Sequence, residues 1–158
     1  MKKLFILLTI TGLFFSFTAS LTAGTPVTKK MVVNLVEKVA QEISKDSPGT
    51  FVKIIKAEHP YKNKDNPALY VFVYDTDVKI IAHPKKVLVG KSYKGKPDVR
   101  GKKFRDAIVT LGLQKGTGWV DYSYQKPGEK GIHEKTTYLK LVKGSDGKKY
   151  IVCAGMYK

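Results

Sequence analysis

Two tyrosines stand two residues apart in the segment GTGWVDYSYQKPGEKG, which runs from residue 116 to residue 131. In an extended strand, successive side chains point to opposite faces, so Val120, Tyr122 and Tyr124 share one face. A face that carries two phenols is neither a plain core face nor a plain solvent face. Phenolic hydroxyls are directional hydrogen-bond donors, which suits them to the recognition of a small polar ligand.

A lysine is placed to supply charge beside these phenols. Lys135 opens the next apolar strand, and alternation puts Lys135, Thr137 and Leu139 on one face. If the two strands are neighbours, one ammonium lies beside Tyr122 and Tyr124, and such a set recognises a small anion. The same pattern is compatible with tyrosines that only pack and with a lysine that is solvated at a strand end.

The histidines do not suggest a metal site, because His59, His83 and His133 are widely separated in the sequence. His83 comes directly before Pro84 at the end of a predicted strand. Its neutral ring can donate a hydrogen bond to a ligand, or it can serve only to hold the following loop. We expect no metal and no other cofactor.

Short motifs of the common enzyme classes are missing from the sequence. It contains no G-x-S-x-G, no G-x-x-x-x-G-K-[ST], and no G-x-G-x-x-G after a strand. Acidic residues are few, so paired carboxylates for acid–base chemistry are hard to find. The one cysteine, Cys153, lies among apolar residues in KYIVCAGMY with no local base, which indicates a buried structural thiol. We therefore do not expect an enzyme.

Apolar periodicity predicts the elements that must position these residues. Residues 28–45 repeat at helical spacing and predict an amphipathic helix. A second helix restarts within residues 44–59, where Ser47 can cap it and Pro48 suits its first turn. A third, short helix is expected over residues 103–116.

Alternating segments predict five strands. Residues 68–84 contain two of them around a turn at residues 75–77, and a long loop of residues 85–102 follows. The other three are expected at residues 118–125, 134–142 and 149–157, the last two joined by an Asp-Gly hairpin. Helices followed by strands in this order predict an α+β domain with one antiparallel sheet.

The N-terminus resembles a secretory signal peptide. Lys2 and Lys3 precede an apolar run that extends to about Phe17, and small residues follow it. We expect cleavage after Ala23 or, nearly as well, after Ser20. The alternative is an uncleaved membrane anchor. Residues 24–158 then form a single domain in the periplasm or outside the cell.

The mature chain would be strongly basic. Removing residues 1–23 leaves 135 residues with 27 basic and 13 acidic side chains, a net charge of +14. Arg100 and Arg105 are the only arginines in the chain, so the charge comes almost entirely from lysine. Specific phosphate and base recognition favours the arginine fork, so we expect no specific nucleic-acid partner. The charge leaves open a second class of function, an exported protein that binds an anionic polymer, a membrane surface or a protein partner.

Five segments in order resemble the single Cache domain of type 2, the extracellular sensor module of bacterial chemoreceptors and kinases. They are LYVFVYDTDVKIIAHP, VLVGKSYKGKPDVRGKKF, GTGWVDYSYQKPG, KTTYLKLV and KYIVCAGMY, and the matching order spans residues 28–158. Family motifs correspond to Ala-His-Pro at residues 82–84, Gly-Trp-Val-x-Tyr at 118–122, Lys-x-x-Tyr at 135–138 and Gly-x-Tyr at 155–157.

The resemblance implies a PAS-like fold, in which a long N-terminal helix packs on a five-stranded antiparallel sheet and a ligand pocket lies on the other face. It also implies a small-molecule ligand, commonly a carboxylate gripped by tyrosines and a basic side chain. The site residues that it implies, together with the chemistry above, are His83, Tyr122, Tyr124, Lys135 and Tyr138.

Receptors of this family have a membrane helix on each side of the sensor domain, whereas this chain ends at Lys158. We therefore expect a binding or sensing module without its own transmembrane output, which reports to a partner such as a membrane receptor or kinase.

Overall fold

A computed structural model describes residues 26–158, and the predicted export segment, residues 1–23, lies outside them. Within the described range, no helix is long and apolar enough to cross a membrane. In chain order the elements are α1 (Lys29–Lys45), α2 (Ser47–Ile55), β1 (Val71–Tyr74), β2 (Ile80–Ala82), a 3-10 turn (Lys86–Leu88), α3 (Phe104–Lys115), β3 (Thr117–Gln125), β4 (Ile132–Lys143) and β5 (Lys149–Tyr157).

Residues 71–157 supply five strands that form one antiparallel sheet in the order β2-β1-β5-β4-β3. The three C-terminal strands pair in chain order, while β1 and β2 join the sheet along β5. As a result, the start of β1 lies close to β4, with only β5 between them. The predicted α+β, PAS-like fold is confirmed.

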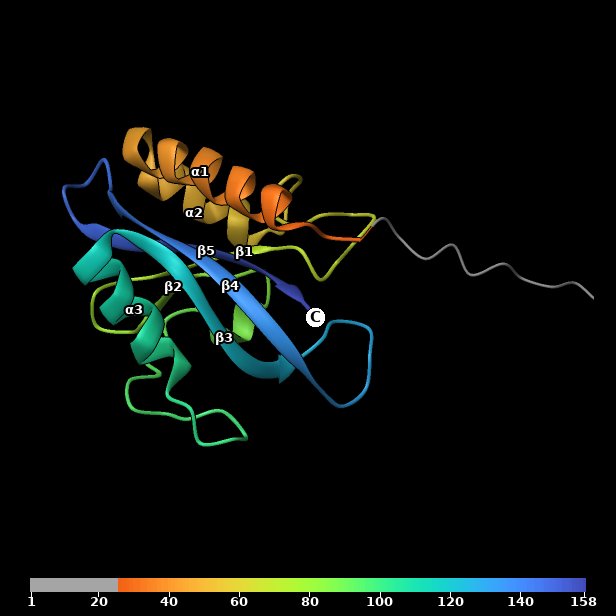
Figure 1. The fold of residues 1–158 in the computed structure, drawn as a ribbon. Coiled ribbons are helices and arrows are strands. Elements are labelled where there is room, and N and C mark those ends of the chain that lie inside the picture. Colours follow the sequence, from red (N-terminus) through yellow and green to blue (C-terminus); the bar gives the residue numbers. More distant parts are fainter. Residues whose placement is uncertain (1–25) are drawn as a thin grey trace, which may run out of the picture.

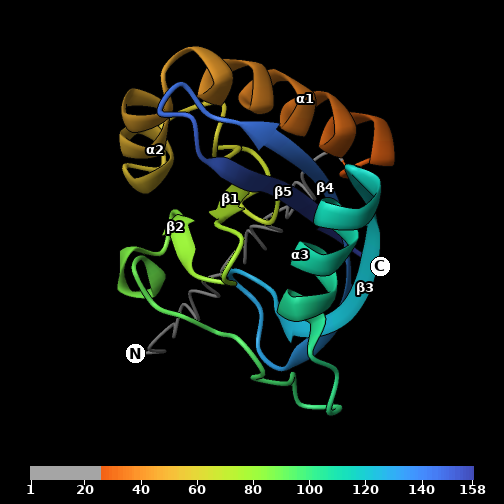
Figure 2. The same ribbon diagram turned by 90° about the vertical axis from the view of Figure 1, so that its left-hand side faces the viewer.

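Helices cover both faces of the sheet (Figures 1 and 2). The α1 and α2 helices lie on one face, and α3 lies on the other with the long loop that precedes it. The first core contains the apolar side of α1, including Val32, Val36 and Ile43, packed on Val73 and Val152. The second core lies under α3 and contains most of the buried aromatic side chains of the sheet. This second face carries the candidate site.

Local polar contacts explain where the first two helices begin. The Thr28 side chain accepts from the Met31 backbone N–H at 3.3 Å and caps α1. The cap of α2 is Asp46, which accepts from the Gly49 N–H at 2.9 Å, and not Ser47 as the sequence suggested. Ser47 is instead buried, and its hydroxyl donates to the Ile43 carbonyl of the preceding helix at 2.8 Å.

The turn between β1 and β2 forms where it was predicted, but it delays the start of β2. One carboxylate oxygen of Asp75 accepts from the backbone N–H groups of Asp77 and Lys79, at 2.9 Å each. Val78 follows with a φ of +63°. These local bonds compete with ladder pairing, so β2 starts only at Ile80.

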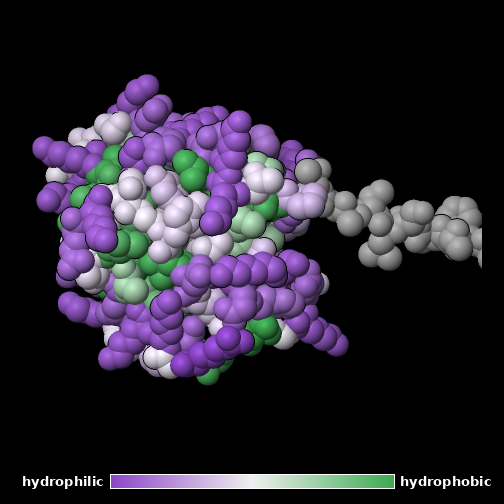
Figure 3. Space-filling model, in the orientation of Figure 1, coloured by the Kyte–Doolittle hydropathy of each residue, from purple (hydrophilic) through white to green (hydrophobic). Residues whose placement is uncertain are grey.

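The surface is mostly hydrophilic. Figure 3 shows polar and charged side chains over most of the face it presents, with smaller hydrophobic areas between them. This agrees with the lysine-rich composition of the chain.

Candidate functional site

Strand register places a lysine between two aromatic residues. Tyr122 of β3 lies opposite Lys135 of β4, and Lys135 lies opposite Tyr157 of β5. Directly opposed residues in an antiparallel sheet point to the same face, so this row lies on the α3 face. Lys135 and Tyr122 are therefore neighbours on one face of the sheet, as predicted.

Lys135 is buried among aromatic rings, with 1% of its surface exposed. Its Nζ donates a hydrogen bond to the phenolic oxygen of Tyr70 at 2.9 Å. The same nitrogen lies 4.2 Å from the ring centroid of Tyr70, 4.9 Å from that of Tyr157 and 5.6 Å from that of Phe72. These rings provide cation–π attraction, which only partly replaces the lost hydration of an ammonium.

No carboxylate among residues 26–158 forms an ion pair with Lys135. Burial of the charged form lowers the pKa of Lys135 from its usual 10.5 to about 7. A buried ammonium without a counter-charge is costly, and an anion placed nearby would relieve that cost.

Gly155 gives the lysine its path across the sheet. A Cβ at this position of β5 would lie 2.8 Å from Cε of Lys135 and 2.6 Å from Oγ1 of Thr137. It would also meet the Thr136 carbonyl oxygen at 2.6 Å, and backbone cannot give way easily. The side chain of Lys135 therefore passes over a glycine to reach Tyr70 on the far side of β5.

His83 is buried at the end of β2, and its two ring nitrogens have separate tasks. Nδ1 accepts from the Lys85 backbone N–H at 2.8 Å, so the neutral ring carries its proton on Nε2. Burial, with help from the charges of Lys135 and Lys85, lowers the pKa of His83 to about 3. The histidine thus holds the loop and also keeps a donor in a ring that packs 5.3 Å from that of Tyr70.

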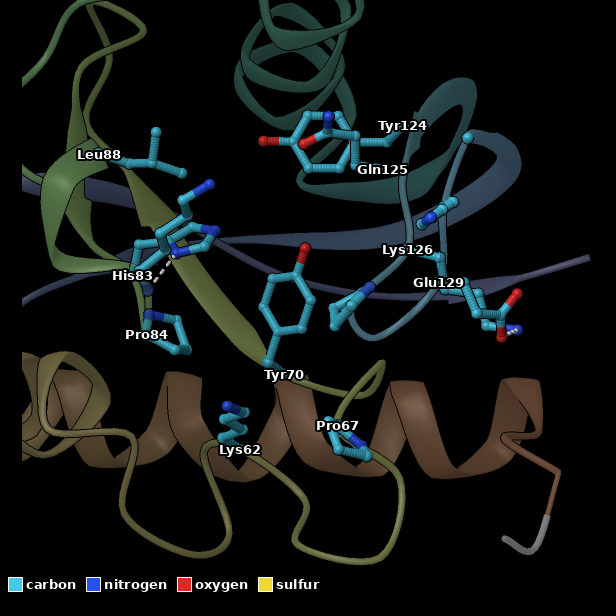
Figure 4. Close-up of a pocket in the computed structure, with 14 residues that line it drawn as sticks. Lys62, Pro67, Tyr70, His83, Pro84, Leu88, Tyr124, Gln125, Lys126 and Glu129 are labelled. Atoms are coloured by element: carbon cyan, nitrogen blue, oxygen red, sulfur yellow. Dashed lines mark hydrogen bonds and ion pairs between the residues drawn. The ribbon is translucent and has the colours of Figure 1, made fainter. Parts of the chain in front are cut away.

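A surface pocket of about 690 Å³ opens beside these groups, and Figure 4 shows its lining. In that view His83 and Leu88 lie on one side of Tyr70, and Tyr124 and Lys126 lie on the other. A smaller inner cavity of about 20 Å³ continues toward α3. The two spaces share four lining residues, which are Tyr70, His83, Leu88 and Tyr124.

The family model of the Cache domain matches residues 32–158. The chain belongs to the Cache domain family. Curated proteins give no match. Among solved structures, it is similar to a periplasmic sensor domain of a chemotaxis protein, with 24% identity, a TM-score of 0.60, and coverage of 79% of this chain and 86% of that chain.

Two further structures resemble this Cache domain. One is a Cache chemosensory domain described for carboxylic acid recognition, with 21% identity, a TM-score of 0.64, and coverage of 81% of this chain and 91% of that chain. The other is a methyl-accepting chemotaxis protein from Vibrio parahaemolyticus RIMD 2210633, with 16% identity, a TM-score of 0.64, and coverage of 82% and 87%. At these identities the likeness concerns the fold.

The two predicted phenols of the Cache domain have different surroundings. Tyr124 is partly exposed and lines both the pocket and the inner cavity. Tyr122 lines only the inner cavity, because its ring stacks on Phe104 at 3.8 Å and its hydroxyl shares a 3.0 Å hydrogen bond with Thr137. Burial raises the pKa values of both tyrosines, so both keep their hydroxyl protons at neutral pH.

The structure does not bring Tyr138 to the pocket. Tyr138 is three positions from Lys135 on β4, so strand alternation turns it to the α1 face. There its hydroxyl donates to Glu37 of α1 at 3.3 Å, and its ring packs 5.3 Å from that of Trp119. We leave Tyr138 out of the proposed site.

Sequence reasoning missed Tyr70, which stands at the centre of the arrangement. Its signal is alternation: Tyr70, Phe72 and Tyr74 place three aromatic rings on one face, between the valines of β1. What the pattern does not show is that this face meets Lys135 from a strand two positions away in the sheet.

Neither a cluster of metal-ligating side chains nor an exposed thiol is present in the described part of this Cache domain. Residues 26–158 contain no group of three or more His, Cys, Asp or Glu side chains that could hold a metal ion. Cys153 is fully buried, as expected, and burial raises the pKa of its thiol well above the usual value.

Proposed function

We propose that this Cache domain binds a small organic acid in the pocket beside Tyr70, as an exported binding or sensing module. The observation that carries the proposal is Lys135, a buried ammonium that has no carboxylate partner in the described chain and lies directly behind the pocket wall. A ligand carboxylate would supply the missing counter-charge.

Tyr70 would connect the ligand with the lysine. Its oxygen accepts from Lys135, and its hydroxyl also interacts with that of Tyr157. Because Tyr70 lines the pocket, its O–H proton would turn from Tyr157 to a ligand that binds there. Burial raises the pKa of Tyr70 to about 12, so the hydroxyl remains a donor at neutral pH. An anion about 5 Å from Nζ gains on the order of 3 kcal/mol at an effective dielectric constant near 20.

His83 and Tyr124 would complete the grip. The Nε2–H of His83 and the hydroxyl of Tyr124 both belong to rings that line the pocket and the inner cavity. Leu88 adds an apolar wall beside His83. A carboxylate has several acceptor positions, so it can receive bonds from three neutral donors while Lys135 balances its charge.

The comparisons support a small-molecule role. Cache domains are ligand-binding signalling modules, and one similar structure is described for carboxylic acid recognition. Residues 1–23 would direct export, residues 24–158 would form the binding domain in the periplasm, and a membrane receptor or kinase would receive its output.

A thermal-shift screen of the purified protein against small organic acids tests this function. We expect saturable stabilisation by at least one acid at modest salt, because a ligand that binds only the folded state raises its stability. Neutral amides of the same acids are the control ligands, and they should give little stabilisation because they carry no charge.

The variant Lys135→Met is the matched protein control, since it keeps most of the side-chain volume and removes the charge. It should still fold but lose the response to the acid. If no acid stabilises the protein, and anionic polymers or vesicles bind it with steep salt dependence, the basic surface and not the pocket is the functional feature.

A further inference from the structure

The pocket of this Cache domain is much larger than a two- or three-carbon acid requires. Its volume of about 690 Å³ falls in the range of sites that enclose ligands of many more atoms. Tyr70, His83 and Tyr124 occupy its inner end, where the inner cavity begins. The rest of the lining leaves room for a second part of the ligand.

That outer part is cationic. Among the described residues, the lining holds one carboxylate, Glu129, which is paired with Lys126 at 2.5 Å. Against it stand the lysines of the lining, Lys62, Lys85, Lys126 and Lys130. The excess of positive charge lies on the pocket itself and is not only a property of the whole surface.

The backbones of two of these lysines adjoin the residues of the inner end, and their long side chains can reach outward from there along the wall. Lys62 forms an isolated backbone β-bridge with Tyr70, and both residues line the pocket. Lys85 comes two residues after His83, and its backbone N–H donates to Nδ1 of that histidine at 2.8 Å. Neither lysine has an ion-pair partner within residues 26–158.

Part of the pocket wall is apolar and stiff. Leu88 and the rings of Pro67, Pro84 and Pro127 belong to the lining. Proline fixes the backbone, so these parts of the wall lose little freedom when a ligand binds.

We infer that the ligand is an acid with two anionic groups joined by a largely apolar spacer. One carboxylate would lie at Tyr70, His83 and Tyr124, and the second anionic group would lie between Lys62 and Lys85. This inference rests on the proposed function and narrows its ligand class from small acids in general to dianionic acids.

The test compares dicarboxylates with their monoamides by calorimetric titration of the protein. The series runs from succinate to pimelate, and each diacid is paired with the monoamide of the same length. Partly exposed lysine–carboxylate pairs are individually weak, so we expect the best diacid to bind about 3- to 30-fold more tightly than its monoamide. The ratio of the monoamide dissociation constant to that of the diacid should fall as salt is added.

Charge-removing variants locate the second group. In Lys62→Met/Lys85→Met the ratio of monoamide to diacid dissociation constants should fall to near one, because the diacid loses more affinity than the monoamide. The control Lys143→Met/Lys149→Met removes two exposed lysines at the far end of the β4–β5 pair and should keep the wild-type ratio. Glu129→Gln releases Lys126 from its partner and should raise the ratio.

Each other result has a definite meaning. Equal binding of diacid and monoamide by the wild type overturns this inference and leaves the proposed function standing. A ratio that survives in Lys62→Met/Lys85→Met overturns the placement of the second group. If neither ligand type binds at any chain length, and simple monoacids also fail, the proposed function itself is wrong.

Discussion

The Nζ atom of Lys135 lies 2.9 Å from the phenolic oxygen of Tyr70, although the two residues are 65 positions apart in the chain. Lys135 belongs to β4 and Tyr70 directly precedes β1, so the bond crosses above β5. Gly155 of β5 leaves the space for it. This bond joins the buried charge of the domain to the wall of its pocket.

Replacing the buried charge should stabilise the protein while it abolishes binding. Below pH 7 the wild type carries an unpaired buried ammonium, and Lys135→Met removes it, which we expect to raise the free energy of unfolding by on the order of 1–4 kcal/mol. Acid affinity should fall by about one to two decades, the loss expected when a charged partner is removed. Urea unfolding at pH 6 and calorimetry measure the two effects.

The stabilisation should depend on pH in a defined window. The pKa of Lys135 is about 7 in the folded state and 10.5 when unfolded, so the unfolded state binds more protons between these values. Wild-type stability therefore gains up to about 1.4 kcal/mol per pH unit from this group as pH rises above 7. The advantage of Lys135→Met should shrink accordingly up to pH 9.5, and tyrosine ionisation near the upper end of this range affects both proteins alike. A constant difference across this range would contradict the assignment.

Ligand affinity should weaken above neutral pH. An anion bound beside Lys135 favours the charged amine, so above pH 7 binding must be accompanied by proton uptake. We expect the dissociation constant to be nearly constant from pH 5.5 to 6.5 and to rise toward about tenfold per pH unit above pH 7.5. Titrations in two buffers of different ionisation enthalpy would detect the proton directly. In Lys135→Met the residual affinity should show no such rise.

Three tyrosine variants separate binding from packing. Tyr124→Phe removes a hydroxyl from a ring that lines the pocket and should cost about 0.5–1.5 kcal/mol of binding free energy. Tyr122→Phe should cost less affinity and more stability, because its hydroxyl is bonded to Thr137. Tyr138→Phe is the matched control, since its hydroxyl bonds Glu37 on the opposite face. Equal affinity losses in all three variants would argue against the pocket.

Filling the space at Gly155 should displace the lysine. Gly155→Ala puts a Cβ within 2.8 Å of Lys135 Cε and within 2.6 Å of a backbone oxygen, so we expect a loss of about 1–3 kcal/mol of stability and weaker binding. The double variant Gly155→Ala/Lys135→Ala removes one of these clashes, so the two substitutions should not be additive. Additive stability losses would mean that the side chain takes another path.

The mature N-terminus is expected between residues 21 and 24. This follows from the two N-terminal lysines, the apolar run and the small residues after it. N-terminal sequencing of protein from a periplasmic extract checks it. Intact Met1 in a membrane fraction would indicate an anchored protein.

Periodicity along the chain was sufficient to predict the helices and strands and to tell which strand residues share a face of the sheet. Strand alternation places Tyr122 and Tyr124 together, and it also separates Tyr138 from Lys135. The family motif Lys-x-x-Tyr suggested that Tyr138 binds the ligand together with Lys135. Strand geometry instead places Tyr138 on the opposite face, against Glu37. Helix spacing likewise predicts α1 within one residue at its N-terminal end.

Only the tertiary structure shows that Lys135 is buried among aromatic rings. A lysine at the start of an apolar strand is compatible with a solvated strand end, and its burial depends on Tyr70, Phe72 and Tyr157, which come from two other strands. The order β2-β1-β5-β4-β3 brings them together, and such non-local pairing leaves no periodic trace in the sequence. The sequence by itself determined the strands and their faces, because these depend on neighbouring residues. The burial of the charge, and with it the site, depended on which strands meet.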